Sequence, residues 1–205
     1  EMRALQNQIN PHFLYNTLET IRMMAEMNDD DRIAEMTFIL GQLLRYGIQV
    51  NEEVTIREEM EHVKNYLFLQ NVRFSNKFEL AIDVDEKFMK LKTVKLLFQP
   101  IVENAIYHGL ETKEGQSTIT IRALQMETHI SFEVTDNGIG MDESTVRRLN
   151  AKLYQGVGKQ EASRHSIGLS NVDERIKLYY GPTFGLSVHS VIDHGTKVTL
   201  TLPIS

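Results

Sequence analysis

The stretch Leu97–Gly109 contains residues that packing alone does not explain. Its pattern predicts an apolar helix, yet Glu103 and Asn104 stand side by side in it, and His108 comes just before a terminating glycine. Asparagine is a poor residue for the interior of a helix, because its side chain competes for backbone hydrogen bonds. An asparagine on so apolar a helix therefore calls for a functional explanation.

Two later stretches supply that explanation. Asp136–Gly140 places an aspartate before a Gly-x-Gly turn, and Ile167–Asn171 places a glycine at the expected start of a helix. A metal prefers oxygen ligands, a base needs a directional acceptor, and phosphates bind backbone N–H groups at a helix start. Together the three stretches predict a site that encloses a nucleotide and its metal.

The composition limits the possible functions. The chain has 205 residues, of which 41% are hydrophobic and 24% charged, a balance typical of one large or two small globular domains. Its net charge of −6 argues against nucleic acid as the main partner. There is no cysteine, no apolar run of membrane-spanning length and no visible signal peptide. Because Glu1 is not an initiator methionine, we expect a missing upstream segment.

Residues 1–50 predict two helices. One face of the first helix is apolar: Leu14, Leu18, Ile21 and Ala25. The opposite face carries His12, Asn16, Glu19 and Met23. The second helix has an apolar seam at alternating spacings of three and four: Ile33, Met36, Leu40, Leu43 and Gly47. A two-helix hairpin cannot bury such stripes alone, so we expect it to pair with a second copy as a four-helix bundle.

The rest of the chain predicts an α/β sandwich. Thr55–Glu58 is a capping box that begins a helix over 56–75. Apolar alternation predicts strands at 78–84, 119–121, 130–134, 186–188 and 198–202. Further helices are expected at 94–108, 141–153 and 167–180, and a mobile loop at 154–166. The predicted fold class is α+β, with a mixed or antiparallel sheet and helices on one face of it.

Four strings, in this order, resemble the motifs of one family. Gln8–Leu18 looks like a phosphoacceptor box, and Gln99–Gly109 resembles an N box. Asp136–Gly140 and Ile167–Val172 resemble two glycine boxes, and a linking helix matches at Tyr66, Gln70, Arg73 and Phe74. The family is that of sensor histidine kinases of the LytS/YesM type. A lone Gly-x-Gly is a weak signal, but four ordered motifs are specific together.

The resemblance implies an architecture and a reaction. It implies dimerisation and phosphotransfer helices at 1–54, a linking helix at 55–77 and an ATP-binding catalytic domain of the GHKL (Bergerat) type at 78–205. It further implies a homodimer through residues 1–50, phosphorylation of His12 from Mg-ATP, and transfer to an aspartate of a response regulator receiver domain. By this resemblance the chain would be the cytoplasmic portion of a bacterial sensor kinase that reaches the membrane only through its upstream part.

The resemblance also implies roles at the nucleotide site. Asn104 would ligate Mg²⁺, and Asp136 would accept a hydrogen bond from the adenine amino group, where guanine presents a carbonyl. Gly138 and Gly140 would let the backbone approach the base, and Gly168 would let a helix start approach the phosphates. The other nucleotide-binding positions that it implies are His108, Leu169 and Thr196.

Structural roles compete with these assignments. Asn104 could be a buried amide paired with backbone, Asp136 a turn-capping residue, and Thr196 an ordinary strand residue. The His12 imidazole is a competent nucleophile when one ring nitrogen is neutral, and its box favours that role. The scatter of the other histidines shows no metal-ligand spacing, so no zinc site is predicted.

Four positions depart from the family pattern: Val94, Tyr107, Ser166 and His194. Tyr107 stands where the family often has lysine, so a phosphate-facing cation is missing there. Lys159 or Arg164 is the hypothesised replacement. None of the departures removes Asn104, Asp136 or Gly168, so ATP binding is still expected.

Two positions bear on the mechanism. Many histidine kinases have an acidic residue directly after the phosphoacceptor, where this chain has Phe13. Glu103 is the candidate base, with a surface carboxylate as the alternative role. Hydrolytic relatives carry a glutamate one turn before the N-box asparagine, where this chain has Pro100. Transfer to His12 is therefore favoured over rapid hydrolysis.

Some alternatives stay open. Asn16 lies one turn after His12, where its amide could orient a water that dephosphorylates the regulator, or could simply pack the helix. The chain could also be a degenerate dimeric scaffold that binds nucleotide and docks a regulator without kinase activity. A serine kinase or anti-sigma factor of the same fold is a third possibility, against which the histidine-bearing hairpin argues.

Overall fold

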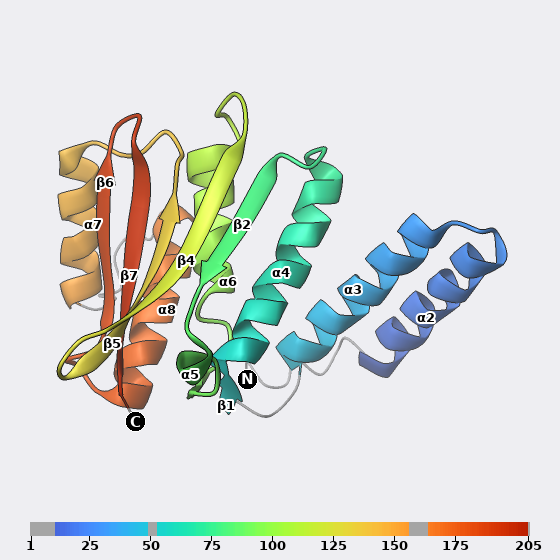
Figure 1. Ribbon diagram of the computed structural model, residues 1–205, viewed down its shortest axis with the longest axis horizontal. Coiled ribbons are helices and arrows are strands. Elements are labelled where there is room, and N and C mark those ends of the chain that lie inside the picture. The colour runs from blue at the N-terminus through green and yellow to red at the C-terminus, as the bar shows by residue number, and fades with distance from the viewer. Residues whose placement is uncertain (1–10, 49–52, 156–163, 205) are drawn as a thin grey trace. The chain divides into compact units, whose positions relative to one another are not determined.

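The computed structural model describes residues 11–48, 53–155 and 164–204 (Figure 1). The chain divides into two compact units, Glu1–Asn51 and Glu52–Ser205. The finer division at 1–54, 55–77 and 78–205 stays a prediction. Within the described ranges, no helix combines the length and the apolar character that crossing a membrane requires.

The first unit is the predicted helical hairpin. Helices α2 (Pro11–Met27) and α3 (Asp31–Ile48) pack against each other, and Asp30 caps α3 by accepting a hydrogen bond from Ile33 N at 3.1 Å. Its buried residues are Ala25, Ala34, Thr37 and Ile39. Ile33 and Leu40 of the predicted seam are 46% and 39% exposed. The seam is therefore not buried within one hairpin, as expected for a surface that needs a partner.

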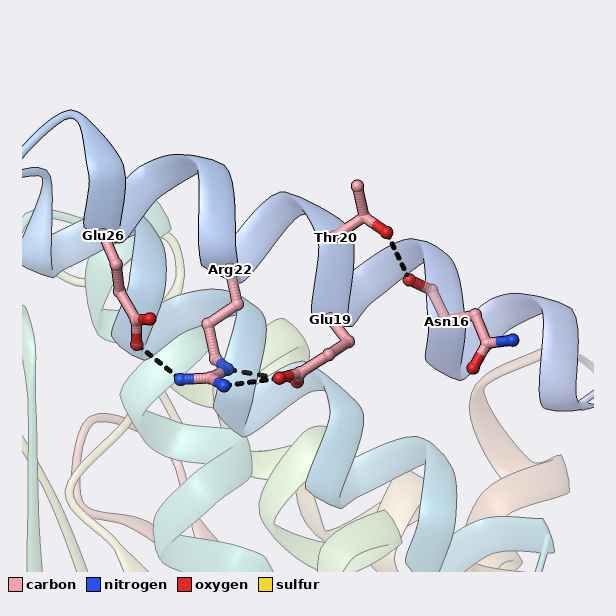
Figure 2. A network of polar contacts seen from close by, with 5 residues as sticks. All are labelled: Asn16, Glu19, Thr20, Arg22 and Glu26. Carbon is pink, nitrogen blue, oxygen red and sulfur yellow. Dashed lines mark hydrogen bonds and ion pairs between the residues drawn. The ribbon is translucent and has the colours of Figure 1, made fainter.

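The polar face of α2 is confirmed as a separate surface. His12, Asn16 and Glu19 are all exposed. Arg22 pairs with both Glu19 and Glu26 (Figure 2). In the same view the Asn16 amide lies outside this ion-pair cluster, while its backbone carbonyl accepts the Thr20 hydroxyl at 2.8 Å.

The second unit is built on a mixed sheet. Among the described residues, five strands follow the order β2 (Phe78–Asp83), β4 (Ser117–Gln125), β5 (His129–Asp136), β7 (Gly195–Pro203) and β6 (Gly185–Val191). The pair β2–β4 is parallel and the other pairs are antiparallel. The sequence did not indicate the small sheet of β1 (Glu53–Thr55) with β3 (Lys92–Val94), nor the short helix α5 (Glu86–Met89).

Helices cover one face of this sheet, as predicted (Figure 1). They include α6 (Gln99–Asn104), its π-helical continuation η1 (Ala105–Leu110) and α8 (Arg164–Tyr180). Helix α7 (Glu143–Gln155) packs on β6, and α4 (Ile56–Arg73) packs on β2 and α6. The core between them is apolar and fully buried: Phe98, Ile101, Ile106, Leu110, Ile119, Ile121, Phe132 and Leu200. Each such side chain contributes roughly 1.5–3 kcal/mol through burial. The α+β fold class is confirmed, and so is the capping box of α4.

The predicted start of the organising helix at residue 94 is wrong. Val94 ends strand β3, Leu96 has a φ of +60°, and the helix begins at Gln99. The cause is Glu59 of α4, a fully buried carboxylate that accepts hydrogen bonds from the backbone N–H groups of Leu96, Leu97 and Phe98. These contacts fix a turn where apolar periodicity alone predicts helix.

Helix α8 also forms a hydrogen bond to this turn. Arg175 Nη1 donates to the Lys95 carbonyl at 2.7 Å.

The predicted start of α8 at Ile167 is also wrong, because the helix begins at Arg164. No glycine or proline separates these positions, so nothing in the sequence stops the helix from extending. Residues 156–163 of the predicted mobile loop lie outside the described residues.

Replacement of Glu59 tests this turn. Glu59→Ala leaves three backbone donors unsatisfied, so we expect a loss of about 3 kcal/mol or more in the free energy of unfolding. The measurement is urea unfolding followed by tyrosine fluorescence. The matched control is Glu61→Ala on the same helix, which removes only an exposed pair with Lys64 and should cost about 0.5 kcal/mol or less. Equal losses in the two variants would contradict the role of Glu59.

Candidate nucleotide-binding site

A cleft lies between α6–η1 and the strands β5 and β7. Its lining residues are Ile101, Asn104, Ala105, His108, Gly109, Val134, Asp136, Gly140, Met141, Thr196 and Val198. Five of the predicted nucleotide-binding residues thus come together: Asn104, His108, Asp136, Gly140 and Thr196. They come from segments that are far apart in the sequence, so the fold assembles the site.

Asp136 is the buried carboxylate of this cleft. It ends β5, is only 5% exposed, and through Oδ1 accepts hydrogen bonds from Gly138 N at 2.8 Å and Thr196 N at 3.3 Å. Burial raises the pKa of Asp136, an effect that these hydrogen bonds and the charge of Lys113 oppose. No described residue hydrogen-bonds Oδ2, so one carboxylate oxygen remains as a directional acceptor for a ligand.

Two glycines after Asp136 are required by close backbone contacts. A Cβ at Gly138 would lie 2.5 Å from the Gly109 carbonyl oxygen. Gly140 has a φ of +67°, and a Cβ there would lie 1.9 Å from the Val191 carbonyl oxygen. The intervening Ile139 N donates to the Gly109 carbonyl at 3.0 Å, which ties this turn to the end of η1.

Ser190 is a structural residue of the site that the sequence did not reveal. Its buried hydroxyl accepts from Met141 N at 2.9 Å, donates to the Gly195 carbonyl at 2.8 Å, and lies 2.9 Å from the Thr196 hydroxyl. It thereby connects the glycine turn to strands β6 and β7. A serine within a strand has no pattern that signals such a role.

Asn104 is half-buried and ends α6 where the helix becomes π-helical. Such π-segments are frequent at functional sites. Its amide has no hydrogen-bond partner in the described part of the chain, which argues against the alternative of an amide paired with backbone. The described residues also contain no group of three or more His, Asp or Glu side chains able to hold a metal. An amide oxygen joined by ligand phosphates fits Mg²⁺, which seldom needs an all-protein cage.

Four residues predicted for the site do not line the cleft: Glu103, Gly138, Gly168 and Leu169. Glu103 lies beside Tyr66 of α4, where burial first, and then the Glu103 charge, raises the pKa of Tyr66. Leu169 is fully buried in α8. Gly168 stands in the second turn of α8 rather than at its start, although a Cβ there would meet nothing within 4 Å. The roles of these residues stay predictions.

The guanidinium of Arg73 lies beside Tyr107, the residue that stands where the family often has lysine. Its Nη1 donates to the Tyr107 hydroxyl at 3.2 Å, and its guanidinium lies 6.0 Å from the Tyr107 ring centre. The match to the linking helix was the only signal for it. Of the replacements hypothesised from sequence, Lys159 and the side chain of Arg164 lie outside the described residues.

In the other unit, His12 and Asn16 lie one turn apart on α2. Asn16 Nδ2 is 3.3 Å from His12 Nδ1. The amide therefore contacts the candidate phosphoacceptor directly.

Family comparison gives these residues a context. Residues 89–205 match the family described as histidine kinase-, DNA gyrase B-, and HSP90-like ATPase, and residues 1–78 match that described as histidine kinase. The chain belongs to this family of histidine kinase-like ATPases. The second match covers the helical hairpin, so the resemblance to sensor histidine kinases is confirmed.

Curated relatives match over nearly the whole chain. Sensor histidine kinase YesM of Bacillus subtilis is 38% identical over 204 residues, which are 99% of this chain and 33% of YesM. Sensor histidine kinase YpdA of Escherichia coli is 34% identical over 205 residues, 99% of this chain and 34% of YpdA. The chain therefore spans about a third of the length of these relatives.

Solved structures show the same fold. The catalytic domain of histidine kinase ThkA, in a nucleotide-free form, aligns with a TM-score of 0.52 at 19% identity, over 74% of this chain and 93% of that one. The kinase domain of the blue-light activated histidine kinase from Erythrobacter litoralis aligns with a TM-score of 0.51 at 12% identity, over 95% of this chain and 94% of that one. Both likenesses support the predicted α+β fold class.

Replacement of Gly140 tests the close packing of the glycine turn. Gly140→Ala should lower the free energy of unfolding by about 3 kcal/mol or more, because left-handed strain adds to a clash with Val191. Gly115→Ala is the matched control, since Gly115 has a φ of +79° but open space around its Cβ position. It should cost only the strain, about 1–2 kcal/mol. Indistinguishable losses in urea unfolding would show that the contact with Val191 is unimportant.

The pH dependence of stability tests the burial of Asp136. Its pKa in the native state is raised above the ordinary value of 3.8, so the native state binds the proton more tightly than the unfolded state does. The stability of the wild type relative to Asp136→Asn should therefore increase as the pH falls from 7 through the native pKa, and level off below 3.8. Urea unfolding of both proteins across this range measures the difference.

Asp142 provides a control for which the expected pH dependence of stability has the opposite sign. Hydrogen bonds from Ser144 and Thr145 hold the pKa of Asp142 well below its usual range. The stability of the wild type relative to Asp142→Asn should therefore decrease as the pH falls below 3.8 towards the lowered native pKa. A parallel pH dependence of the two variants would rule out the assigned environment of Asp136.

Proposed function

We propose that the chain is the catalytic portion of a sensor histidine kinase that transfers the γ-phosphoryl group of Mg-ATP to His12. The phosphoryl group then passes to an aspartate of a response regulator receiver domain. The observation that carries this proposal is the cleft in which the Asp136 carboxylate and the Asn104 amide are both available to a ligand. The family matches at both ends of the chain support it.

The cleft suits adenine and a metal-bound triphosphate. Asp136 Oδ2 would accept a hydrogen bond from the adenine amino group, whereas the guanine carbonyl would meet a carboxylate and be repelled. Thr196, positioned by Ser190, would lie against the base. Asn104 would hold Mg²⁺, which supplies charge neutralisation of the phosphates when bound. His108 and Arg73 are the proposed cationic or donor groups near the phosphates.

The transfer step needs a neutral imidazole. One ring nitrogen of His12 attacks the γ-phosphorus, the bond to the β,γ-bridging oxygen breaks, and ADP leaves. The other ring nitrogen retains its proton in the phosphoimidazolium, which then loses it to solvent. Glu103 as a base stays a prediction that its place beside Tyr66 does not favour. Asn16 in regulator dephosphorylation also stays a prediction.

The exposed apolar side chains of the hairpin support a homodimer through residues 1–50. Within one chain these exposed side chains include Ile21, Met24, Ile33, Phe38 and Leu40. Pairing with a second hairpin as a four-helix bundle would bury them. Because the relatives are named as sensor kinases and this chain spans a third of their length, we place it on the cytoplasmic side of a membrane-anchored sensor.

Incubation with γ-labelled ATP and Mg²⁺ tests the proposed kinase activity. The wild type should acquire an acid-labile, alkali-stable label. His12→Ala should bind the nucleotide without acquiring label, and Asn104→Ala should lose the Mg²⁺-dependent part of binding. Nucleotide binding by the wild type without any label would support the alternative of a regulator-docking scaffold instead.

Pro100 provides a prediction about hydrolysis. In a His12→Ala background we expect very slow ATP turnover, because position 100 offers no base to activate water. Pro100→Glu in that background should raise turnover by roughly tenfold or more, since general-base catalysis contributes factors of that order or larger. Pro100→Gln is the matched control and should stay slow. Phosphate release assays measure all three, and brisk turnover in His12→Ala alone would contradict the account.

A further inference from the structure

A second cavity lies in the Glu52–Ser205 unit, away from the nucleotide cleft. Ile130 of β5 and Leu202 of β7 line it and pair with each other in the sheet. The cleft is lined by another pair from the same two strands, Asp136 and Thr196. Because Asp136 comes six residues after Ile130 in β5, the two places are about 20 Å apart along the strands. The second cavity is therefore separate from the nucleotide site.

Core side chains give the second cavity an apolar interior. Its volume is about 430 Å³, which is within the range of sites that hold small molecules. Four of its lining residues belong to the core and are at most 4% exposed: Ile56, Ile130, Phe132 and Leu202. An apolar molecule that binds there leaves water for an apolar surface, which is favourable.

Two tyrosines of α8 form an aromatic wall of this cavity. The ring centres of Tyr179 and Tyr180 lie 4.8 Å apart, and the ring planes are 73° from each other. Tyr180 donates its hydroxyl hydrogen to the Thr93 hydroxyl at 3.2 Å, which holds its ring in place. Tyr179 is 48% exposed, so its ring is accessible. Since aromatic rings favour edge-to-face contacts, this wall suits a planar aromatic ligand.

The Glu53 carboxylate of β1 is the hydrogen-bond acceptor of this cavity, at the end of the unit where β7 also ends (Figure 1). Its Oε1 accepts from the Tyr179 hydroxyl at 3.2 Å, and its Oε2 accepts from Lys92 Nζ at 2.9 Å. The hydrogen bond from Lys92 is the main cause that lowers the pKa of Glu53, so the carboxylate is ionised at neutral pH.

This carboxylate has room for a further donor. Among the described residues each Glu53 oxygen has one hydrogen-bond partner, whereas a carboxylate oxygen can accept two. The positive charge of Lys92 already balances the negative charge of Glu53. The pair therefore favours an uncharged ligand with an N–H or O–H group over an ion of either sign.

We propose that the second cavity binds a small, uncharged aromatic molecule that carries a hydrogen-bond donor, as indoles and phenols do. The ring packs on the apolar interior beside Tyr179, and the donor binds Glu53. This site goes beyond the proposed kinase function and does not depend on it, because the second cavity and the nucleotide cleft share no lining residue.

Methyl NMR of the whole chain, with ¹³C-labelled isoleucine and leucine methyl groups, tests the site with indole as the probe. The signals of Ile130, Leu202 and Ile101 are assigned by their loss in Ile130→Val, Leu202→Met and Ile101→Val. Indole should shift the Ile130 and Leu202 signals saturably, with a Kd of about 1 mM or lower. The signal of Ile101, which lines the nucleotide cleft, should not follow the same curve.

Benzofuran is the matched control ligand, since it has nearly the shape of indole but an oxygen in place of the N–H. It should bind roughly tenfold more weakly, because it offers no donor to the carboxylate. Glu53→Gln should reduce this preference for indole to about threefold or less, because a neutral acceptor forms a weaker hydrogen bond. Glu86→Gln, which changes an exposed carboxylate paired with Arg57, is the matched control variant and should keep the preference.

Three results would overturn the proposal. The first is the absence of any shift of the Ile130 and Leu202 signals at an indole concentration of about 10 mM, well above the expected Kd. The second is a set of shifts confined to Ile101, which would place indole in the nucleotide cleft. The third is equal binding of indole and benzofuran by the wild type, which would remove the role of Glu53. None of these results bears on phosphorylation of His12.

Discussion

The nucleotide site depends on one buried carboxylate that is only partly satisfied by the protein. Asp136 uses Oδ1 to hold the glycine turn and the start of β7, through the N–H groups of Gly138 and Thr196. Burial makes its charge costly, as the raised pKa indicates. In the proposed function, a ligand that donates to Oδ2 would offset part of that cost, so burial of this carboxylate would favour a purine with a donor at that position.

The second constraint is the placement of Asn104 relative to this carboxylate. Helix α6 begins only at Gln99, because Glu59 of α4 binds three backbone N–H groups of the preceding turn. Arg175 of α8 binds a carbonyl of the same turn. Helices α4 and α8 therefore share one turn that fixes where α6 starts. A displacement of either helix would be transmitted toward Asn104 through these hydrogen bonds, of which those of Glu59 to Leu97 and Phe98 are buried and that of Arg175 is exposed.

Much of the fold and of the candidate site could be predicted from the sequence, because apolar alternation, helix capping and glycine turns are local signals. The capping box at Thr55, the strands and the residues Asn104, Asp136 and Gly140 at one site followed from such signals. The turn at Leu96 did not, since a carboxylate that lies far away in the sequence overrides apolar periodicity. The roles of Ser190 and Arg73 did not either, because each depends on which segment the fold places beside it.

The most direct test of the central claim is the nucleotide preference of the cleft. Calorimetric titration of the wild type with Mg-ATP and with Mg-GTP should show ATP binding at least about tenfold more tightly, a difference of about 1.4 kcal/mol. Asp136→Asn should lose most of that preference while keeping its fold. Equal binding of the two nucleotides by the wild type, or an unchanged preference in Asp136→Asn, would contradict the assignment of the buried carboxylate as the reader of the base.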